Sequence, residues 1–183
     1  MKTEKVDISL SRFHRIFPPR PVVMLGCTDK AGKGNVITLG MSMPVSVRPP
    51  LVAVGIAPER YPHELIEQTK EFTLNVPTME IVKETLYCGR VSGKNRNKIK
   101  EVGLTQLQAK KVKAPIIKEC ITHLECKLNQ QVTVGDHTIF VDKVVAAYVN
   151  EEAFTEKYDI KKVKPIYYGD RVRGVRSPAD SIP

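Results

Sequence analysis

The stretch Asn35-Val-Ile-Thr-Leu-Gly-Met-Ser-Met-Pro-Val-Ser-Val-Arg-Pro-Pro-Leu-Val-Ala-Val54 contains two predicted strands separated by a proline pair. Residues 35–41 are predicted as the first strand, and the almost wholly apolar run 51–56 as the second. Pro49-Pro50 interrupts the chain between them, because proline cannot donate to a strand ladder. The stretch therefore indicates a β-sheet with closely spaced strands.

Similar signals continue on both sides of this stretch. Short apolar or β-branched runs predict further strands over 21–26, 72–76, 115–134, 137–149 and 165–169, with a turn at 29–34. Gly135-Asp136 separates the two long runs, which are predicted as one hairpin. Helices are predicted over 63–70, after an N-cap at Thr78, and over 92–102 before Gly103. Because hairpin spacing dominates, we expect a mainly β fold, an antiparallel sheet closed into a barrel with short helices outside, rather than a doubly wound parallel sheet.

Length and composition favour one soluble globular domain over residues 1–183. The 183 residues are too few for two comfortable domains, and 42% hydrophobic with 27% charged residues is close to the globular average, which excludes a disordered or fibrous chain. No run approaches the roughly 18 apolar residues of a membrane span. Residues 1–10 lack the apolar centre of a signal peptide, so we expect a cytoplasmic protein without membrane association.

The chain is basic, with a net charge of +9 from 29 Lys and Arg against 20 Asp and Glu. Such a charge attracts nucleic acids, acidic membrane surfaces or phosphorylated small molecules, although a solvated lysine-rich surface is the simplest explanation. The chain has no Trp and 6% aromatic residues, which leaves few platforms for stacking bases. A nucleic-acid-binding barrel therefore stays a weaker alternative, and we expect no nucleic acid partner.

The four cysteines do not form a metal-binding pattern. Cys27, Cys88, Cys120 and Cys126 include no C-x-x-C pair, so no metal site is predicted. Cys120 and Cys126 are both placed on the predicted strand 115–134, roughly 20 Å apart at the usual strand rise, which is too far for a disulfide. All four are expected to be buried, reduced thiols.

Familiar catalytic and nucleotide motifs are absent. The sequence has no G-x-G-x-x-G, no G-x-x-x-x-G-K-[ST], no G-x-S-x-G and no H-E-x-x-H. What remains is a set of small polar residues: Thr38, Ser42 and Ser46 recur every four residues. The basic segment 92–98 adds Lys and Arg at a predicted helix start, where anions bind readily. Taken alone, both features are more typical of solvent-facing strand residues and solvated helix faces than of a binding site.

Four ordered blocks give these residues a context. Besides 35–54, they are Arg60-Tyr-Pro-His-Glu-Leu-Ile66 with Glu71-Phe-Thr-Leu-Asn-Val-Pro77, Cys88-Gly-Arg-Val-Ser-Gly93 with Lys98, and Gly135-Asp-His-Thr-Ile-Phe-Val141. In this order and spacing the chain resembles the flavin reductase-like family, whose members bind FMN in a split β-barrel, and it is most similar to the flavoredoxin and archaeal ferric reductase-like branch. The resemblance covers about residues 13–169.

The resemblance implies a cofactor site and a catalytic candidate. His137 matches a histidine near the flavin face, where nicotinamide is expected to dock. The residues that match cofactor-binding positions line the flavin ring and ribityl chain or reach the phosphate; they are Asn35, Thr38, Gly40, Met41, Ser42, Ser46, Arg60, His63, Ser92 and Lys98.

Three positions depart from the family pattern. Gly40 replaces the usual Ser, Met41 stands where many relatives have Trp, and Pro62 replaces a common Ser or Thr. The changes at Gly40 and Pro62 each remove a side-chain hydroxyl, and Pro62 also removes a backbone N–H donor. The resemblance therefore implies FMN binding while leaving the second reactant open.

Two functions follow from the resemblance. In the first, the protein is an oxidoreductase in which NADH or NADPH, a small nucleotide donor, reduces FMN, and FMN passes the electrons to free flavin, ferric iron or a protein. In the second, it is an FMN electron-transfer protein without NAD(P)H activity, and its positive charge attracts an acidic redox partner protein. The resemblance also implies a homodimer.

Overall fold

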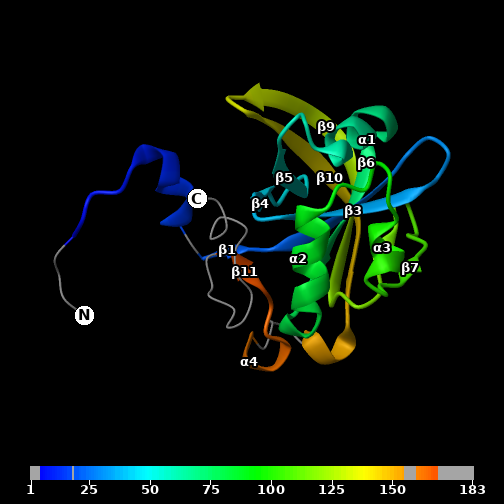
Figure 1. The fold of residues 1–183 in the computed structure, drawn as a ribbon. Coiled ribbons are helices and arrows are strands. Elements are labelled where there is room, and N and C mark those ends of the chain that lie inside the picture. The colour runs from blue at the N-terminus through cyan, green and yellow to red at the C-terminus, as the bar shows by residue number, and fades with distance from the viewer. Residues whose placement is uncertain (1–4, 18, 155–159, 169–183) are drawn as a thin grey trace.

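The fold is built on one antiparallel sheet, seen in a computed structural model that describes residues 5–17, 19–154 and 160–168. Its seven strands follow the order β3-β2-β6-β9-β10-β5-β4, and every pairing is antiparallel (Figure 1). The sheet strands are β2 (Val23–Thr28), β3 (Gly34–Leu39), β4 (Ser42–Ser46), β5 (Leu51–Ile56), β6 (Glu71–Val76), β9 (Thr122–Val134) and β10 (His137–Val149).

The order of the strands requires the sheet to curl. β3 and β4 are the two edges of the sheet, yet only Gly40 and Met41 separate them in the chain. Two residues span only about 7 Å, so the two edges must lie next to each other. The sheet therefore forms a barrel that is split between β3 and β4, which confirms the predicted fold class.

Short helices and two-stranded ribbons complete the fold. The ribbons pair β1 (Arg20–Pro21) with β11 (Tyr167–Tyr168) and β7 (Gln106–Leu107) with β8 (Ile116–Ile117). The helices are η1 (Leu10–Arg15), α1 (Tyr61–Thr69), η2 (Met79–Ile81), α2 (Val82–Arg90), α3 (Lys98–Glu101), η3 (Glu151–Ala153) and α4 (Ile160–Val163). Within the described ranges, none of these helices has the length and apolar character needed to cross a bilayer.

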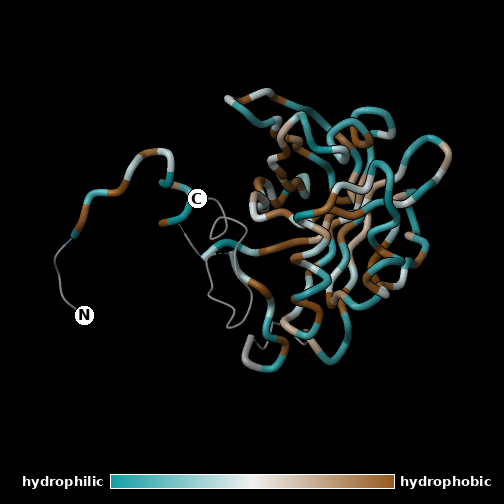
Figure 2. Tube along the Cα trace, in the orientation of Figure 1, coloured by the Kyte–Doolittle hydropathy of each residue, from teal (hydrophilic) through white to brown (hydrophobic). Residues whose placement is uncertain are grey.

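Two apolar cores explain how the helices are placed. The first fills the barrel, with Phe72 and Phe140 fully buried in it. The second lies between the sheet and α2 and α3, and includes Met24, Cys88 and Ile99. In Figure 2 the hydrophobic colour follows the strands through the body, while the outer loops are mainly hydrophilic.

Local signals account for the helix boundaries. Pro62 lies in the first turn of α1, where its missing N–H costs nothing, and Lys70 ends the helix with a φ of 60°. Thr78 caps the next helical segment, because its hydroxyl accepts a hydrogen bond from the Glu80 N–H. Gly135 has a φ of 60° in the tight turn between β9 and β10. The predicted N-cap and hairpin are confirmed.

Two predictions of secondary structure were wrong. The helix expected over 92–102 is confined to Lys98–Glu101 and begins after Asn97, so Ser92 does not lie at a helix start. The strand expected over 115–134 is interrupted: β8 ends at Ile117 and β9 begins at Thr122. Cys120 therefore lies in the connection and not on the strand that contains Cys126. All four cysteines are free and buried, as expected.

Candidate functional site

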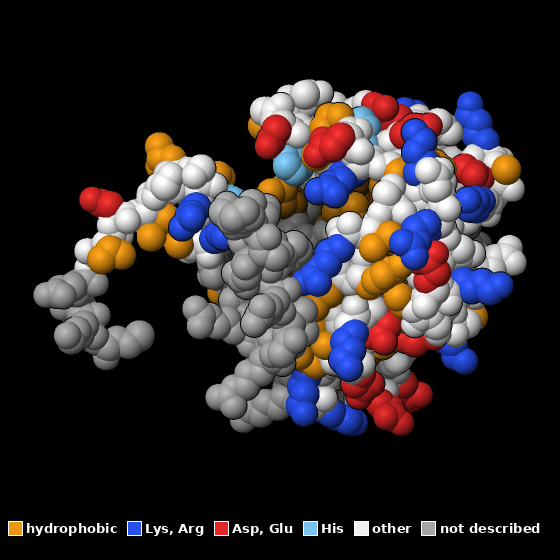
Figure 3. Space-filling view, viewed as in Figure 1, with side chains coloured by type: hydrophobic (Ala, Val, Ile, Leu, Met, Phe, Trp, Pro, Cys, Tyr) orange, Lys and Arg blue, Asp and Glu red, His pale blue; other side chains and the backbone are white. Residues whose placement is uncertain are grey.

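A pocket opens where the two edges of the sheet meet. It has a volume of about 240 Å³ and is bordered by the end of β3, by Gly40 and Met41, and by the end of β5. α2 closes one side with Gly89, whose Cα packs against Thr38: a Cβ at residue 89 would lie 3.2 Å from the Thr38 Cβ. Cationic side chains lie on both sides of a hollow on this face in the space-filling view (Figure 3).

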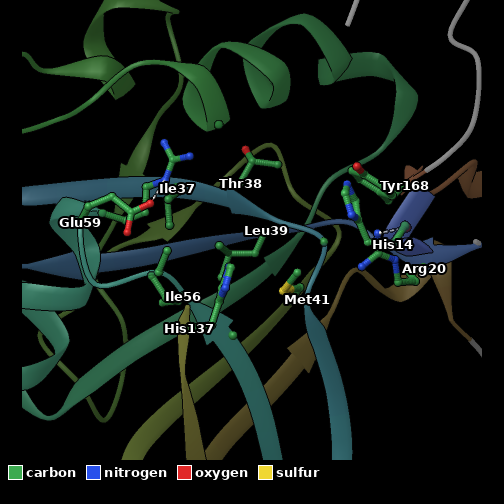
Figure 4. Close-up of a pocket in the computed structure, with 15 residues that line it drawn as sticks. His14, Arg20, Ile37, Thr38, Leu39, Met41, Ile56, Glu59, His137 and Tyr168 are labelled. Atoms are coloured by element: carbon green, nitrogen blue, oxygen red, sulfur yellow. Dashed lines mark hydrogen bonds and ion pairs between the residues drawn. The ribbon is translucent and has the colours of Figure 1, made fainter. Parts of the chain in front are cut away.

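The walls of the pocket combine apolar and polar groups. Ile37, Leu39 and Ile56 present aliphatic side chains, as Figure 4 shows. Thr38 donates its hydroxyl hydrogen to the Thr85 carbonyl at 2.5 Å, which leaves the lone pairs of the oxygen as acceptors. An apolar wall with a few fixed polar groups is typical of sites that bind a small organic molecule.

Five of the predicted site residues line this pocket together: Thr38, Gly40, Met41, Arg60 and His137. Arg60 precedes α1 and has an exposed side chain whose nearest anion is Glu59, at 4.0 Å. The His137 Nδ1–H donates to the exposed carboxylate of Asp136 at 2.7 Å. Nε2 of His137 has no hydrogen-bond partner among the described residues.

A second group of predicted residues gathers around Gly93. Lys98 is buried, and its Nζ donates to the Cys88 carbonyl at 2.9 Å. A Cβ on Gly93 would overlap the Asn35 side-chain amide and lie 3.2 Å from the Lys98 Cε, so these three residues are in close contact. The structure thus brings Asn35 and Lys98 together although they are far apart in the chain.

The electrostatics of Lys98 indicate an anion site. Burial lowers the pKa of Lys98, and the positive charge of Arg60 lowers it further against the opposing effect of the Cys88 and Cys27 thiols. Only one of the three ammonium hydrogens has a partner among the described residues. An anion between Lys98 and Arg60 would relieve both the burial cost and the repulsion.

Asn35 and Lys98 lie outside the pocket lining, and so do the remaining predicted residues. His63 is buried, with Nε2 2.8 Å from the Thr138 hydroxyl, Nδ1 3.5 Å from Glu67 and its ring against Phe140, so both ring nitrogens have protein partners. Ser42 and Ser46 are half-buried on β4. Ser92 is exposed, and its hydroxyl accepts from the Lys94 N–H at 3.4 Å.

Sequence reasoning missed the residues at one end of the pocket. His14, Arg20 and Tyr168 line the pocket but come from the two ends of the described chain. The available signals were local: Arg20 stands beside the prolines that precede the first buried strand, and Tyr168 is in the predicted tail strand. Neither signal shows that the two segments meet.

Comparisons with known proteins agree with this geometry. The sequence model of the family described as flavin reductase like domain matches residues 15–176. An uncharacterized protein of Archaeoglobus fulgidus is 38% identical over 145 residues, which cover 79% of this chain and 78% of that protein.

Solved structures share the fold over most of their length. Flavoredoxin from Methanosarcina acetivorans has 34% identity and a TM-score of 0.80, covering 90% of this chain and 86% of that one. Flavoredoxin of Desulfovibrio vulgaris (Miyazaki F) has 27% identity and a TM-score of 0.79, covering 88% and 87%. Since the family match spans nearly the whole barrel and these flavoredoxins share its fold, the chain belongs to the flavin reductase like family of split-barrel proteins.

Proposed function

We propose that the protein binds FMN in the pocket between the sheet edges and passes electrons from NADH or NADPH through it to a second acceptor. The family and the neighbouring flavoredoxins support a flavin-related redox function. FMN supplies the electron-transfer chemistry when bound, and the protein supplies position and charge.

The observation that carries the proposal is the apolar pocket with Arg60 in its lining, together with the buried ammonium of Lys98, whose pKa the charge of Arg60 lowers. The aliphatic walls suit a flat ring, and the two cations suit the dianionic phosphate at the other end of FMN. Asn35 contributes an amide next to Lys98, and Thr38 contributes an acceptor to the polar part of the chain between ring and phosphate. These residues fit the cofactor in both shape and charge.

Replacing Arg60 by Gln tests this assignment. Loss of a charge-assisted hydrogen bond costs about 1.5–3 kcal/mol, so the Kd for FMN should rise roughly 10- to 100-fold. Riboflavin has no phosphate, and its Kd should change little. Lys98→Met should behave in the same way, and Lys100→Met, which changes an exposed lysine of the same helix, is the control.

Titration of the flavin spectrum with apoprotein measures both affinities. A loss of equal size for FMN and riboflavin would contradict a phosphate role for Arg60 and Lys98. If the wild-type protein takes up no flavin at all, the proposed cofactor is wrong.

His137 is proposed to orient the electron donor. Its ring lines the pocket, and the bond to Asp136 fixes the tautomer that offers Nε2 as an acceptor. His137→Ala should slow the reduction of bound FMN by NADH or NADPH. Stopped-flow absorbance without oxygen measures the rate, and an unchanged rate at equal flavin occupancy would remove His137 from this role.

The same measurement separates the two candidate functions. Rapid bleaching of the FMN bands by either nucleotide supports the oxidoreductase and identifies the donor. If neither nucleotide bleaches the flavin, the protein is an electron carrier, and its net charge of +9 should make reduction by an acidic partner protein fall steeply with salt.

A further inference from the structure

The two ends of the described chain build one end of the pocket. β1 pairs with β11, with Arg20 opposite Tyr168, and the Val22 N–H donates to the Ile166 carbonyl at 3.0 Å. Figure 4 shows His14, Arg20 and Tyr168 together at this end and Glu59 at the other. Arg20 and Tyr168 are therefore held next to each other by backbone pairing.

Arg20 is fixed in place but keeps unused donors. Its Cζ lies 4.4 Å from the centroid of the Tyr168 ring, and its Nη2 donates to the His14 carbonyl at 3.0 Å. Its Nε is buried and has no hydrogen-bond partner among the described residues. Buried donors are nearly always satisfied, so an unpartnered N–H in a pocket-lining guanidinium indicates a missing acceptor.

Gly40 makes room for this geometry. A Cβ at residue 40 would lie 3.2 Å from Cδ2, 3.4 Å from Cγ and 3.5 Å from Cβ of Tyr168. The first of these contacts is tighter than ordinary packing, so any side chain at position 40 would push the ring and the guanidinium stacked on it. The glycine at position 40, where the family usually has serine, thus allows Tyr168 to pack close to the strand end with Arg20 stacked on its ring.

The charge at this end of the pocket is positive. Among the described residues that line the pocket, Glu59 is the one carboxylate, and it lies at the opposite end (Figure 4). The Nε–H of Arg20 has no partner among the described residues, and a guanidinium suits a carboxylate or phosphate group because it presents parallel N–H donors.

We propose that Arg20 binds an oxyanion group of the second reactant, the molecule that exchanges electrons with the flavin, and that Tyr168 and Gly40 hold Arg20 in position. The inference rests on the proposed function and adds a specificity-determining residue to it. The oxyanion has two sources: a phosphate of the nicotinamide nucleotide, or a carboxylate on the acceptor, such as the citrate of a ferric chelate.

Equilibrium binding to FMN-saturated protein tests the proposal without turnover. The probes are NADP⁺, NAD⁺ and citrate, titrated by calorimetry into the wild-type protein and into Arg20→Gln. Removing one charge-assisted hydrogen bond should raise the Kd of the probe that Arg20 binds roughly 10- to 100-fold. Arg12→Gln removes the same charge from an exposed position of η1 and should leave all three affinities unchanged.

The pattern across the probes identifies the source of the oxyanion. If Arg20→Gln weakens the binding of NADP⁺ alone, Arg20 binds the phosphate that NAD⁺ lacks. If it weakens the binding of both nucleotides, Arg20 binds a phosphate that they share. If it weakens the binding of citrate alone, Arg20 binds a carboxylate of the acceptor. Equal affinities of wild type and Arg20→Gln for every probe overturn the proposal. Failure of the wild type to bind FMN is a separate result, which overturns the proposed function and this inference with it.

Two further variants test positioning with Arg20 intact. Gly40→Ala displaces the Tyr168 ring, and Tyr168→Leu removes it. Both variants should therefore lower the affinity for the same probe whose binding Arg20→Gln weakens. Tyr168→Phe keeps the ring and should retain binding. If Gly40→Ala and Tyr168→Leu bind that probe like the wild type while folding normally, Arg20 needs no support from Tyr168 and that part of the proposal is wrong.

Discussion

Two buried ionisable side chains oppose each other in the pH dependence of stability. Burial raises the pKa of Asp142 from 3.8 to about 7, and both of its carboxylate oxygens lack a hydrogen-bond partner in the described structure. Burial lowers the pKa of His123 from 6.5 to about 4, while its Nδ1 lies 2.8 Å from the Asn75 side-chain oxygen. Because that oxygen also accepts from the Ile117 N–H, the His123 Nδ1–H is the donor, and the lowered pKa keeps the ring neutral at pH 7.

The signs of the two contributions differ. Below pH 3.8 the Asp142 carboxyl is protonated in both the folded and the unfolded chain, and its contribution to the unfolding free energy is at its full value of about 4 kcal/mol. This contribution is lost as the pH rises from 3.8 to 7, because the unfolded chain releases the proton first. His123 contributes about 3 kcal/mol above pH 6.5, which is lost as the pH falls through 4. Between pH 4 and 6.5 the two effects largely cancel.

Asp142→Asn should therefore expose the contribution of His123. The unfolding free energy of the variant should rise with pH between 4 and 6.5, and the variant should gain about 4 kcal/mol relative to the wild type between pH 4 and 7. Urea unfolding at a series of pH values measures both curves. His123→Gln should show the opposite slope, and parallel curves for wild type and Asp142→Asn would contradict the buried-acid assignment.

At the scale of an element, the Glu125 carboxylate holds the segment 110–112 against the barrel through hydrogen bonds. Glu125 on β9 is fully buried and accepts hydrogen bonds from the N–H groups of Lys110, Lys111 and Val112 and from the Tyr148 hydroxyl. Burial alone would raise the pKa of Glu125, but these bonds lower it overall. The carboxylate thus takes the place of the backbone acceptors that this segment lacks.

Glu125→Ala should detach the segment that includes residues 110–112. Three backbone donors would lose their acceptor, and we expect a loss of about 3 kcal/mol or more in unfolding free energy. Hydrogen exchange of amides 110–112 should accelerate before the barrel strands exchange. Glu119→Ala is the matched control, because within the described structure the Glu119 carboxylate accepts only from the exposed Thr105 N–H. Unchanged protection of residues 110–112 in Glu125→Ala would contradict this role.

Element prediction worked where the signal was local. Long runs rich in β-branched residues and a glycine turn defined the hairpin of β9 and β10, and a threonine cap located η2. The interruption before Thr122 was missed, because Ile and Cys continue the apolar pattern through a turn. The helix over 92–102 was overextended, since lysine and asparagine predict solvent exposure but do not show where hydrogen bonding begins.

At the scale of the molecule, apolar side chains remain uncovered along one edge. β4 ends the sheet, and Met43 is 62% exposed there, while Val47 in the following turn is 85% exposed. The segment before β1, which extends from the body in Figure 1, exposes Leu10 and Phe17. Exposed edges and apolar patches of this kind favour association with another chain, and we propose a second copy of this protein.

A charged substitution on this edge tests the homodimer. Val45→Lys should shift the molecule toward the monomer in sedimentation velocity, because burying a lysine at an apolar interface is unfavourable. Val132→Lys changes a similarly exposed valine at the tip of the β9–β10 hairpin and should have no effect. A wild-type protein that sediments as a monomer at high concentration would contradict the dimer.

The sequence by itself determined the fold class, the long hairpin and the family, because β-branched runs, a turn glycine and ordered blocks are local properties of the chain. The two edges of the sheet came from the tertiary structure, since β4 was not predicted as a strand. Only the tertiary structure decided which site residues come together. It buried Lys98 beside Asn35, gave both nitrogens of His63 protein partners, and brought Arg20 and Tyr168 over Gly40. These contacts depend on strand order and on the space left by a missing Cβ, and neither is encoded in the residues next to them.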